Sequence, residues 1–87
     1  MGFPGQAEDE LRDQEIRVVL VDRHAMVREG LSLILTREPG ITVVGSAGDS
    51  REAVLMTADL QPNVVILDAD LPDTLGLIAR LSAVAPT

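Results

Sequence analysis

Three short apolar runs divide the chain from residue 16 onward. They cover 16–21, 41–47 and 64–67, and each is rich in β-branched side chains. A short continuous apolar run of this kind is typical of a strand buried on both faces of a parallel sheet. The pattern therefore predicts three such strands.

Helical spacing of apolar residues separates these strands. The stretch 24–37 carries an apolar stripe with a period close to 3.6, and Pro39-Gly40 ends it. Gly30 interrupts this helix, and close helix–sheet packing is one reason for a glycine there. The stripe residues that we expect in the core are Met26, Val27, Leu31, Ile34 and Leu35.

Two further helices are predicted after the second and third strands. Asp49 begins a capping box in which its side chain accepts from the Glu52 amide and Glu52 reaches back. The third helix is expected over 75–84. In the second helix the inward residues are expected to be Ala53, Met56, Thr57 and Leu60.

The order of elements is β-α-β-α-β-α, which predicts an α/β fold with a parallel sheet and right-handed crossovers. Ligands of such sheets bind at the carboxyl ends of the strands. Two strands end in an aspartate, Asp22 and Asp68, so both carboxylates should lie at this edge. Paired carboxylates suit Mg²⁺, and a carboxylate can also form an aspartyl phosphate. Capping of the following helices is the simpler alternative.

Composition narrows the chemistry. Fourteen acidic residues face seven cations, all of them arginine, so any reaction that needs a lysine ammonium is excluded within these residues. The net charge of −7 argues against direct nucleic-acid binding. No apolar stretch is long enough for a membrane span. The absence of cysteine fits a reducing, cytoplasmic location, and residues 1–15 read as an acidic flexible tail, with a short helix over 8–14 as the alternative.

Several segments together resemble the receiver domains of bacterial two-component response regulators. The stretch 16–31 reads IRVVLVDRHAMVREGL, 61–68 reads QPNVVILD, and Asp68, Pro72 and Gly76 have the Asp-x3-Pro-x3-Gly spacing of that family. The resemblance is strongest to the LuxR/NarL-type subfamily, which carries a C-terminal helix-turn-helix. It covers residues 16–87 apart from the extreme end.

The resemblance implies a flavodoxin-like receiver fold and a role for each matching position. Asp68 matches the phosphoacceptor that receives a phosphoryl group from a histidine kinase. Asp22 matches an acid that holds Mg²⁺, and Asp70 matches the residue whose backbone carbonyl ligates the metal. Pro72 to Gly76 match the mobile loop beside the phosphosite. The receiver would not itself be an enzyme, and transcription regulation would use a DNA-binding domain outside these residues.

Two departures from the family pattern change the expected chemistry. Arg23 stands where the family has a second metal-binding acid, and only three of five βα units are present, so the later Ser/Thr and Lys positions are missing. Phosphoryl transfer depends on charge neutralisation at the phosphoryl oxygens. We therefore expect weak or absent Mg²⁺-dependent phosphorylation, with Arg23 as a counter-ion over Asp22 and Asp68. A solvated arginine is the alternative for Arg23, and His24 is expected at the surface rather than as a ligand.

Three units also leave the third strand, 64–67, at the edge of the sheet. An apolar edge invites pairing with another chain, so self-association through this strand is expected. A phosphorylation-independent interaction or dimerisation module is therefore the main alternative function. The Asp68-Ala69-Asp70 sequence also resembles the opening of haloacid-dehalogenase-type phosphatases, which is the remote alternative.

Overall fold

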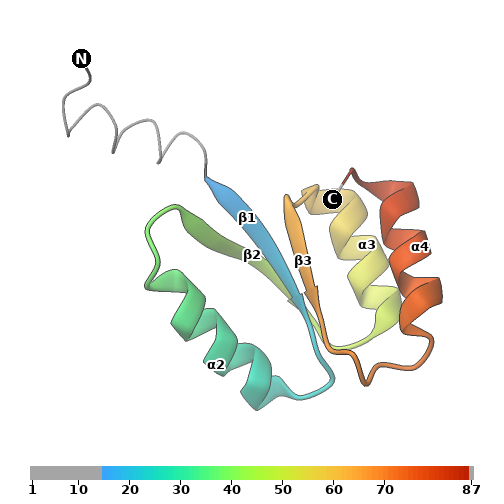
Figure 1. Ribbon diagram of the computed structural model, residues 1–87, viewed down its shortest axis with the longest axis horizontal. Helices are drawn as coiled ribbons and strands as arrows, with labels where there is room; N and C mark the ends of the chain where they lie inside the picture. The colour runs from blue at the N-terminus through green and yellow to red at the C-terminus, as the bar shows by residue number, and fades with distance from the viewer. Residues whose placement is uncertain (1–14, 87) are drawn as a thin grey trace.

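The computed structural model describes residues 15–86 and contains three strands and three helices in strict alternation (Figure 1). The predicted acidic tail lies outside the described residues except for Glu15, whose carboxylate accepts a hydrogen bond from the Thr42 hydroxyl. In chain order the elements are β1 (Ile16–Val21), α2 (Ala25–Thr36), β2 (Ile41–Ala47), α3 (Ser50–Leu60), β3 (Val64–Leu67) and α4 (Thr74–Val84).

The three strands form one parallel sheet in the order β2-β1-β3. The central strand, β1, has Val21 paired with Ala47 on one side and with Leu67 on the other. The register with β2 shifts between Val18 and Val19, a bulge that lets the longer strand follow the shorter one. The parallel sheet predicted from the apolar runs is confirmed, and it brings the carboxyl ends of all three strands to one edge.

One face of the sheet is covered by two helices that pack against each other. Figure 1 shows α3 and α4 side by side on this face, and the two helices are in contact. Strand residues on this face and helix residues make one hydrophobic cluster, whose buried members are Val19, Val21, Ala47, Ala53, Leu71, Leu77 and Leu81. Ala53 and Thr57 are buried and Met56 and Leu60 pack against the cluster, so the predicted inward face of α3 is confirmed.

The opposite face carries only α2, and that helix has no buried residue. The strand residues that alternate toward this face, Val18 and Leu20, are nevertheless fully covered. The predicted core stripe of α2 is wrong in part, because Met26 is 85%, Ile34 is 60% and Val27 is 43% exposed. Gly30 has no atom within 4 Å of where a Cβ would stand, so close packing does not explain this glycine. A single helix is too narrow to shield its own apolar stripe and the sheet together.

The helix starts differ slightly from the sequence prediction. Asp49 accepts a hydrogen bond from the Glu52 amide at 2.8 Å as expected, but the Glu52 carboxylate accepts from the Gly48 amide, at 3.3 Å, rather than from Asp49. The third helix begins at Thr74, after Asp73 in the left-handed region with φ of 53°. Gly76 therefore lies in the first helical turn and not in a loop, and a Cβ there would collide with the Asp73 carboxylate.

None of the helices in residues 15–86 has the length and apolar character that crossing a bilayer demands.

Candidate functional site

Backbone hydrogen bonds place both strand-end aspartates at the same edge of the sheet. The Asp22 amide donates to the Ala47 carbonyl at 3.1 Å, and the Asp68 amide donates to the Val21 carbonyl at 2.9 Å. These bonds extend the parallel ladders one residue beyond each strand, so the two residues are neighbours across the sheet. The predicted juxtaposition of Asp22 and Asp68 is present.

His24 joins these carboxylates, which the sequence prediction missed. Its Nδ1 lies 3.0 Å from Asp22 Oδ1, and its backbone amide donates to the same oxygen at 2.7 Å. One possible ligand atom from each of Asp22, His24 and Asp68 lies within 4.8 Å of the others. The signal was the Asp-x-His spacing, because an aspartate commonly accepts from the amide two residues later and so fixes that residue beside it.

The electrostatics of Asp22 favour its ionised form. The pKa of this carboxyl lies below its ordinary value of 3.8, mainly because the backbone amide of His24 donates a hydrogen bond to it. Partial desolvation raises the pKa, and the nearby His24 ring and Arg28 lower it further. The Asp22 side chain is 14% exposed, whereas that of His24 is 64% exposed. The site is therefore an anionic pocket with an imidazole at its solvent side.

Arg28 holds the loop that carries Asp22. Its Nη1 donates to the Asp22 backbone carbonyl at 2.5 Å, and the same atom would lie 3.2 Å from a Cβ at Gly48. The guanidinium thus reaches from the first turn of α2 to the loop after β1, and Gly48 leaves room for it. No sequence pattern marked Arg28, since its role depends on where the loop and the helix meet.

Asp68 is fixed by the tight turn that follows it. The Asp70 amide donates to Asp68 Oδ1 at 2.9 Å, and the Leu71 amide donates to the Asp68 carbonyl at 3.2 Å. Leu71 is 5% exposed and anchors this turn in the core. Asp70 is thus beside Asp68 as predicted, but its own carboxylate is exposed and does not belong to the group formed by Asp22, His24 and Asp68.

Arg23 lies close to the site but makes no ion pair with it in the described part of the chain. Its side chain is exposed and lines an open hollow of about 370 Å³ together with Pro72 and residues 48–51, which lead into α3. The prediction that Arg23 sits over both carboxylates has no contact to support it. The side chain that contacts the Asp22 carboxylate is instead His24, since the Asx turn directs its ring toward Asp22.

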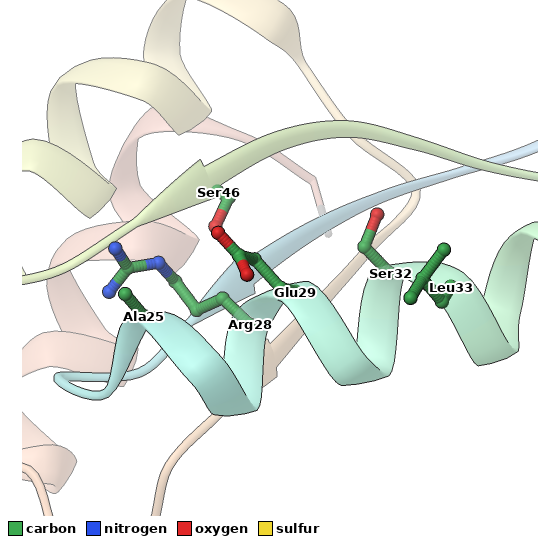
Figure 2. A pocket seen from close by; sticks show the side chains of 6 residues that line it. All are labelled: Ala25, Arg28, Glu29, Ser32, Leu33 and Ser46. Carbon is green, nitrogen blue, oxygen red and sulfur yellow. The ribbon is translucent and has the colours of Figure 1, made fainter.

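A larger groove of about 620 Å³ runs beside this edge, between α2 and β2 (Figure 2). Figure 2 shows the Glu29 side chain pointing toward Ser46, with Arg28 at the end of the groove nearest the site. The lining is Ala25, Arg28, Glu29, Ser32, Leu33 and Ser46. The groove is wide open and no hydrogen bond joins Glu29 to Ser46, so it adds no activated nucleophile to the carboxylate edge.

The donor set can hold a divalent cation. Mg²⁺, the metal that the receiver resemblance implies, prefers six oxygen ligands, and the two carboxylates fit this preference. Arg23, which follows Asp22, offers no oxygen ligand, and the third side chain with a ligand atom within 4.8 Å of the two carboxylates is His24. The cluster therefore fits a divalent cation, but its composition departs from an all-oxygen magnesium site.

Comparisons with known proteins agree with this arrangement. A family model for the response regulator receiver domain matches residues 18–83. The chain is 43% identical over 74 residues to protein-glutamate methylesterase/protein-glutamine glutaminase 1 of Xanthomonas campestris pv. campestris, covering 83% of this chain and 21% of that protein. It is 45% identical over 53 residues to the transcriptional regulatory protein LiaR of Bacillus subtilis, covering 61% of this chain and 25% of LiaR.

Among solved structures, the response regulator domain of Thermotoga maritima CheB aligns with a TM-score of 0.77 and 35% identity. The alignment covers 84% of this chain and 56% of that chain. The chain thus spans less than two thirds of each of these relatives. The flavodoxin-like α/β arrangement predicted from the sequence is confirmed for the three βα units described.

Proposed function

This chain belongs to the response regulator receiver domain family, and on that premise we propose that Asp68 is its phosphoacceptor and that Mg²⁺-dependent phosphorylation there is weak. The observation that carries the proposal is the position of Asp68 at the carboxyl end of β3, beside Asp22 and a turn that orients it. The phosphoryl donor is a histidine kinase, as the receiver resemblance implies.

The geometry supports attack by one oxygen of Asp68. Oδ1 accepts the Asp70 amide, while Oδ2 has no hydrogen-bond partner among the described residues. Attack of Oδ2 on a phosphohistidine would form a P–O bond and break the P–N bond. The transferred group would become an acyl phosphate, and the released imidazole would take up a proton. A bound divalent cation would supply charge neutralisation at the phosphoryl oxygens.

Charge explains why this transfer is weak. Asp22 and Asp68 repel an incoming phosphoryl group, and neutralisation is the main contribution that a protein makes to phosphoryl transfer. By the receiver resemblance, Arg23 stands in place of an acidic metal ligand. The metal would therefore be held by fewer ligands, and the product would be less stabilised.

The output of the module is proposed to be transcription regulation by a DNA-binding domain outside these residues. LiaR, a transcriptional regulatory protein, supports this output, while the methylesterase relative makes an enzymatic output the alternative. The chain itself carries a net charge of −7, which disfavours contact with a phosphate backbone.

A phosphorylation-independent interaction module is the second candidate function. It is favoured by exposed apolar side chains at the third strand, where Val64 is 41% and Ile66 is 36% exposed. Among the described residues β3 pairs only with β1, so its outer backbone groups are free to pair with a second copy. Self-association through β3 is the form that we propose for this function.

Intact mass after incubation with Mg²⁺ and a small-molecule phosphodonor tests the proposed phosphorylation. We expect only a small fraction of protein to gain one phosphoryl group, and none in Asp68→Asn. Arg23→Asp, which restores an acid, should raise the phosphorylated fraction. Stoichiometric phosphate on the unaltered chain, or an unchanged fraction in Arg23→Asp, would contradict the role given to charge.

Sedimentation with and without the phosphodonor tests the second function. A dimer that forms equally in both conditions, and that Ile66→Lys converts to monomer, would support the interaction module. Dimerisation only after phosphorylation would favour a signalling switch, and a monomer at all concentrations would exclude self-association.

A further inference from the structure

The cluster formed by Asp22, His24 and Asp68 differs from an all-oxygen magnesium site by its imidazole. We propose that this cluster binds a borderline divalent cation of the Zn²⁺ class, with the His24 ring as a ligand, in preference to Mg²⁺. The inference rests on the proposed function in using the same two carboxylates, but it concerns which metal they hold and does not require phosphoryl transfer.

The geometry of the three side chains is close to that of a bound cation. Zn²⁺ lies about 2.0–2.2 Å from nitrogen and oxygen ligands, which places tetrahedral ligands roughly 3.4 Å from one another. The Nδ1 of His24 and Oδ1 of Asp22 are 3.0 Å apart, and no pair in the cluster is more than 4.8 Å apart. Rotation of the exposed His24 ring and a small shift of Asp68 suffice to enclose an ion.

Two parts of the pocket are already fixed in a way that suits metal binding. The backbone amide of His24 donates to Asp22 Oδ1 at 2.7 Å, and Arg28 holds the Asp22 carbonyl. The Asp70 amide fixes Asp68 Oδ1. Such secondary hydrogen bonds orient metal-ligating carboxylates and typically strengthen binding. The exposed His24 ring would exchange its contact with Asp22 Oδ1 for the metal and release the Nδ1 proton if it carries one.

The chemistry of the donors decides the preference. An imidazole nitrogen suits Zn²⁺ and other late first-row ions, whereas Mg²⁺ selects oxygen and gives up its waters reluctantly. Among the clustered side chains only Asp22 and Asp68 offer oxygen, and the third ligand is the nitrogen of His24. Three protein ligands would leave a fourth position open, as in metal sites that bind water or an anion.

The composition of the chain makes the assignment testable without ambiguity. His24 is the only histidine, and there is no cysteine. Any nitrogen-selective metal site built from side chains must therefore use His24. The ring protons of a single histidine also give one resolved set of signals, so a metal that binds this imidazole is seen directly in a proton spectrum.

The experiment is a titration of the tag-free chain with Zn²⁺, followed by the imidazole proton signals and by calorimetry. We expect the His24 signals to change until one equivalent is added and to stay unchanged with the same concentration of Mg²⁺. A tenfold excess of Mg²⁺ should not displace the Zn²⁺. His24→Asn, at an exposed position, should lower the Zn²⁺ affinity at least about tenfold.

Controls separate this inference from the proposed function. Asp59→Asn removes an exposed carboxylate outside the cluster and should leave the affinity unchanged, while Asp68→Asn should reduce it. Circular dichroism verifies that each variant is folded. Equal Zn²⁺ affinity in His24→Asn, or equal changes with Mg²⁺, would overturn the inference. A phosphodonor experiment that fails while Zn²⁺ binds His24 would contradict only the phosphoacceptor role of Asp68.

Discussion

The two faces of the sheet differ in how they are covered, although β1 supplies residues to both. On one face, Val19 and Val21 join a closed cluster with α3 and α4. On the other face, Val18 and Leu20 are equally buried, but the helix above them, α2, buries none of its own residues. The side chains of β1 are buried on both faces of the sheet, whereas helix residues are buried only on the face that α3 and α4 cover.

This difference shows what an amphipathic pattern does and does not specify. The stripe of α2 does not mark a buried side of the helix, since Met26 and Ile34 are mostly exposed although Val18 and Leu20 of β1 are covered. Burial of the stripe itself needs neighbours on both flanks, and α4 supplies such a neighbour to α3 but no described element supplies one to α2. Apolar spacing therefore predicts the need for burial, and the number of packed elements decides whether it is met.

The largest expected effect on stability is the loss of a leucine from the sheet face that α3 and α4 cover. Leu77 is fully buried in the cluster, so Leu77→Ala should lower the free energy of unfolding by about 2–5 kcal/mol. Leu33 on α2 is 67% exposed, and Leu33→Ala should change it by less than about 0.5 kcal/mol. Urea unfolding measures both. A large cost at Leu33 would mean that a second molecule covers α2 in solution.

Replacing glycine by alanine should change the free energy of unfolding in opposite directions on the two faces of the sheet. A Cβ at Gly45 would lie 2.5 Å from Met56 Sδ, so Gly45→Ala should destabilise the protein by about 1–3 kcal/mol. Gly30→Ala meets nothing within 4 Å and should stabilise it by about 1 kcal/mol through helix propensity. Thermal unfolding compares the two variants. Destabilisation by Gly30→Ala would show that another surface packs against α2.

A buried hydroxyl that finds no hydrogen-bond partner within residues 15–86 destabilises the face that α3 and α4 cover. Thr57 is fully buried, and its Oγ1 has no hydrogen-bond partner among the described residues. Thr57→Val keeps the shape and removes the unsatisfied group, so it should stabilise the protein by about 1 kcal/mol. Thr36 on α2 donates to the Ser32 carbonyl at 2.8 Å, and Thr36→Val should bring no such gain. Destabilisation by Thr57→Val in urea unfolding would mean that the hydroxyl is satisfied.

The smallest expected effect is at the edge where both faces meet. The pKa of Asp22 is lowered mainly by the His24 amide, so the folded state binds a proton there less readily than the unfolded state. The resulting stabilisation is complete above pH 3.8 and is lost as pH falls through the lower pKa of the folded state. Carboxyl titration by NMR in metal-free buffer should place the midpoint of Asp22 below 3.8. A midpoint above this value would contradict the hydrogen bond to the amide.

The sequence predicted those residues of the candidate site that directly follow a strand. Asp22 and Asp68 directly follow apolar runs, so a parallel sheet had to bring them to one edge. The sequence placed His24 at the surface, and its side chain is 64% exposed, but its contact with Asp22 was not predicted because the ring position depends on an Asx turn. Arg28 was missed because it bridges two segments that only the fold brings together. The apolar spacing placed Gly76 inside a helix over 75–84 and only the receiver resemblance placed it in a loop; the structure agrees with the spacing, since α4 begins at Thr74 after Asp73 in the left-handed conformation.

The sequence by itself determined the alternation of strands and helices, the parallel sheet and the edge that carries the acids. Each of these follows from local spacing, since apolar period and strand-end position act over a few residues. The tertiary structure alone decided that α2 buries none of its residues, that Arg23 makes no ion pair among the described residues and that the His24 ring contacts Asp22. These outcomes depend on the balance of packing and hydrogen bonds between segments distant in the chain, which no local pattern encodes.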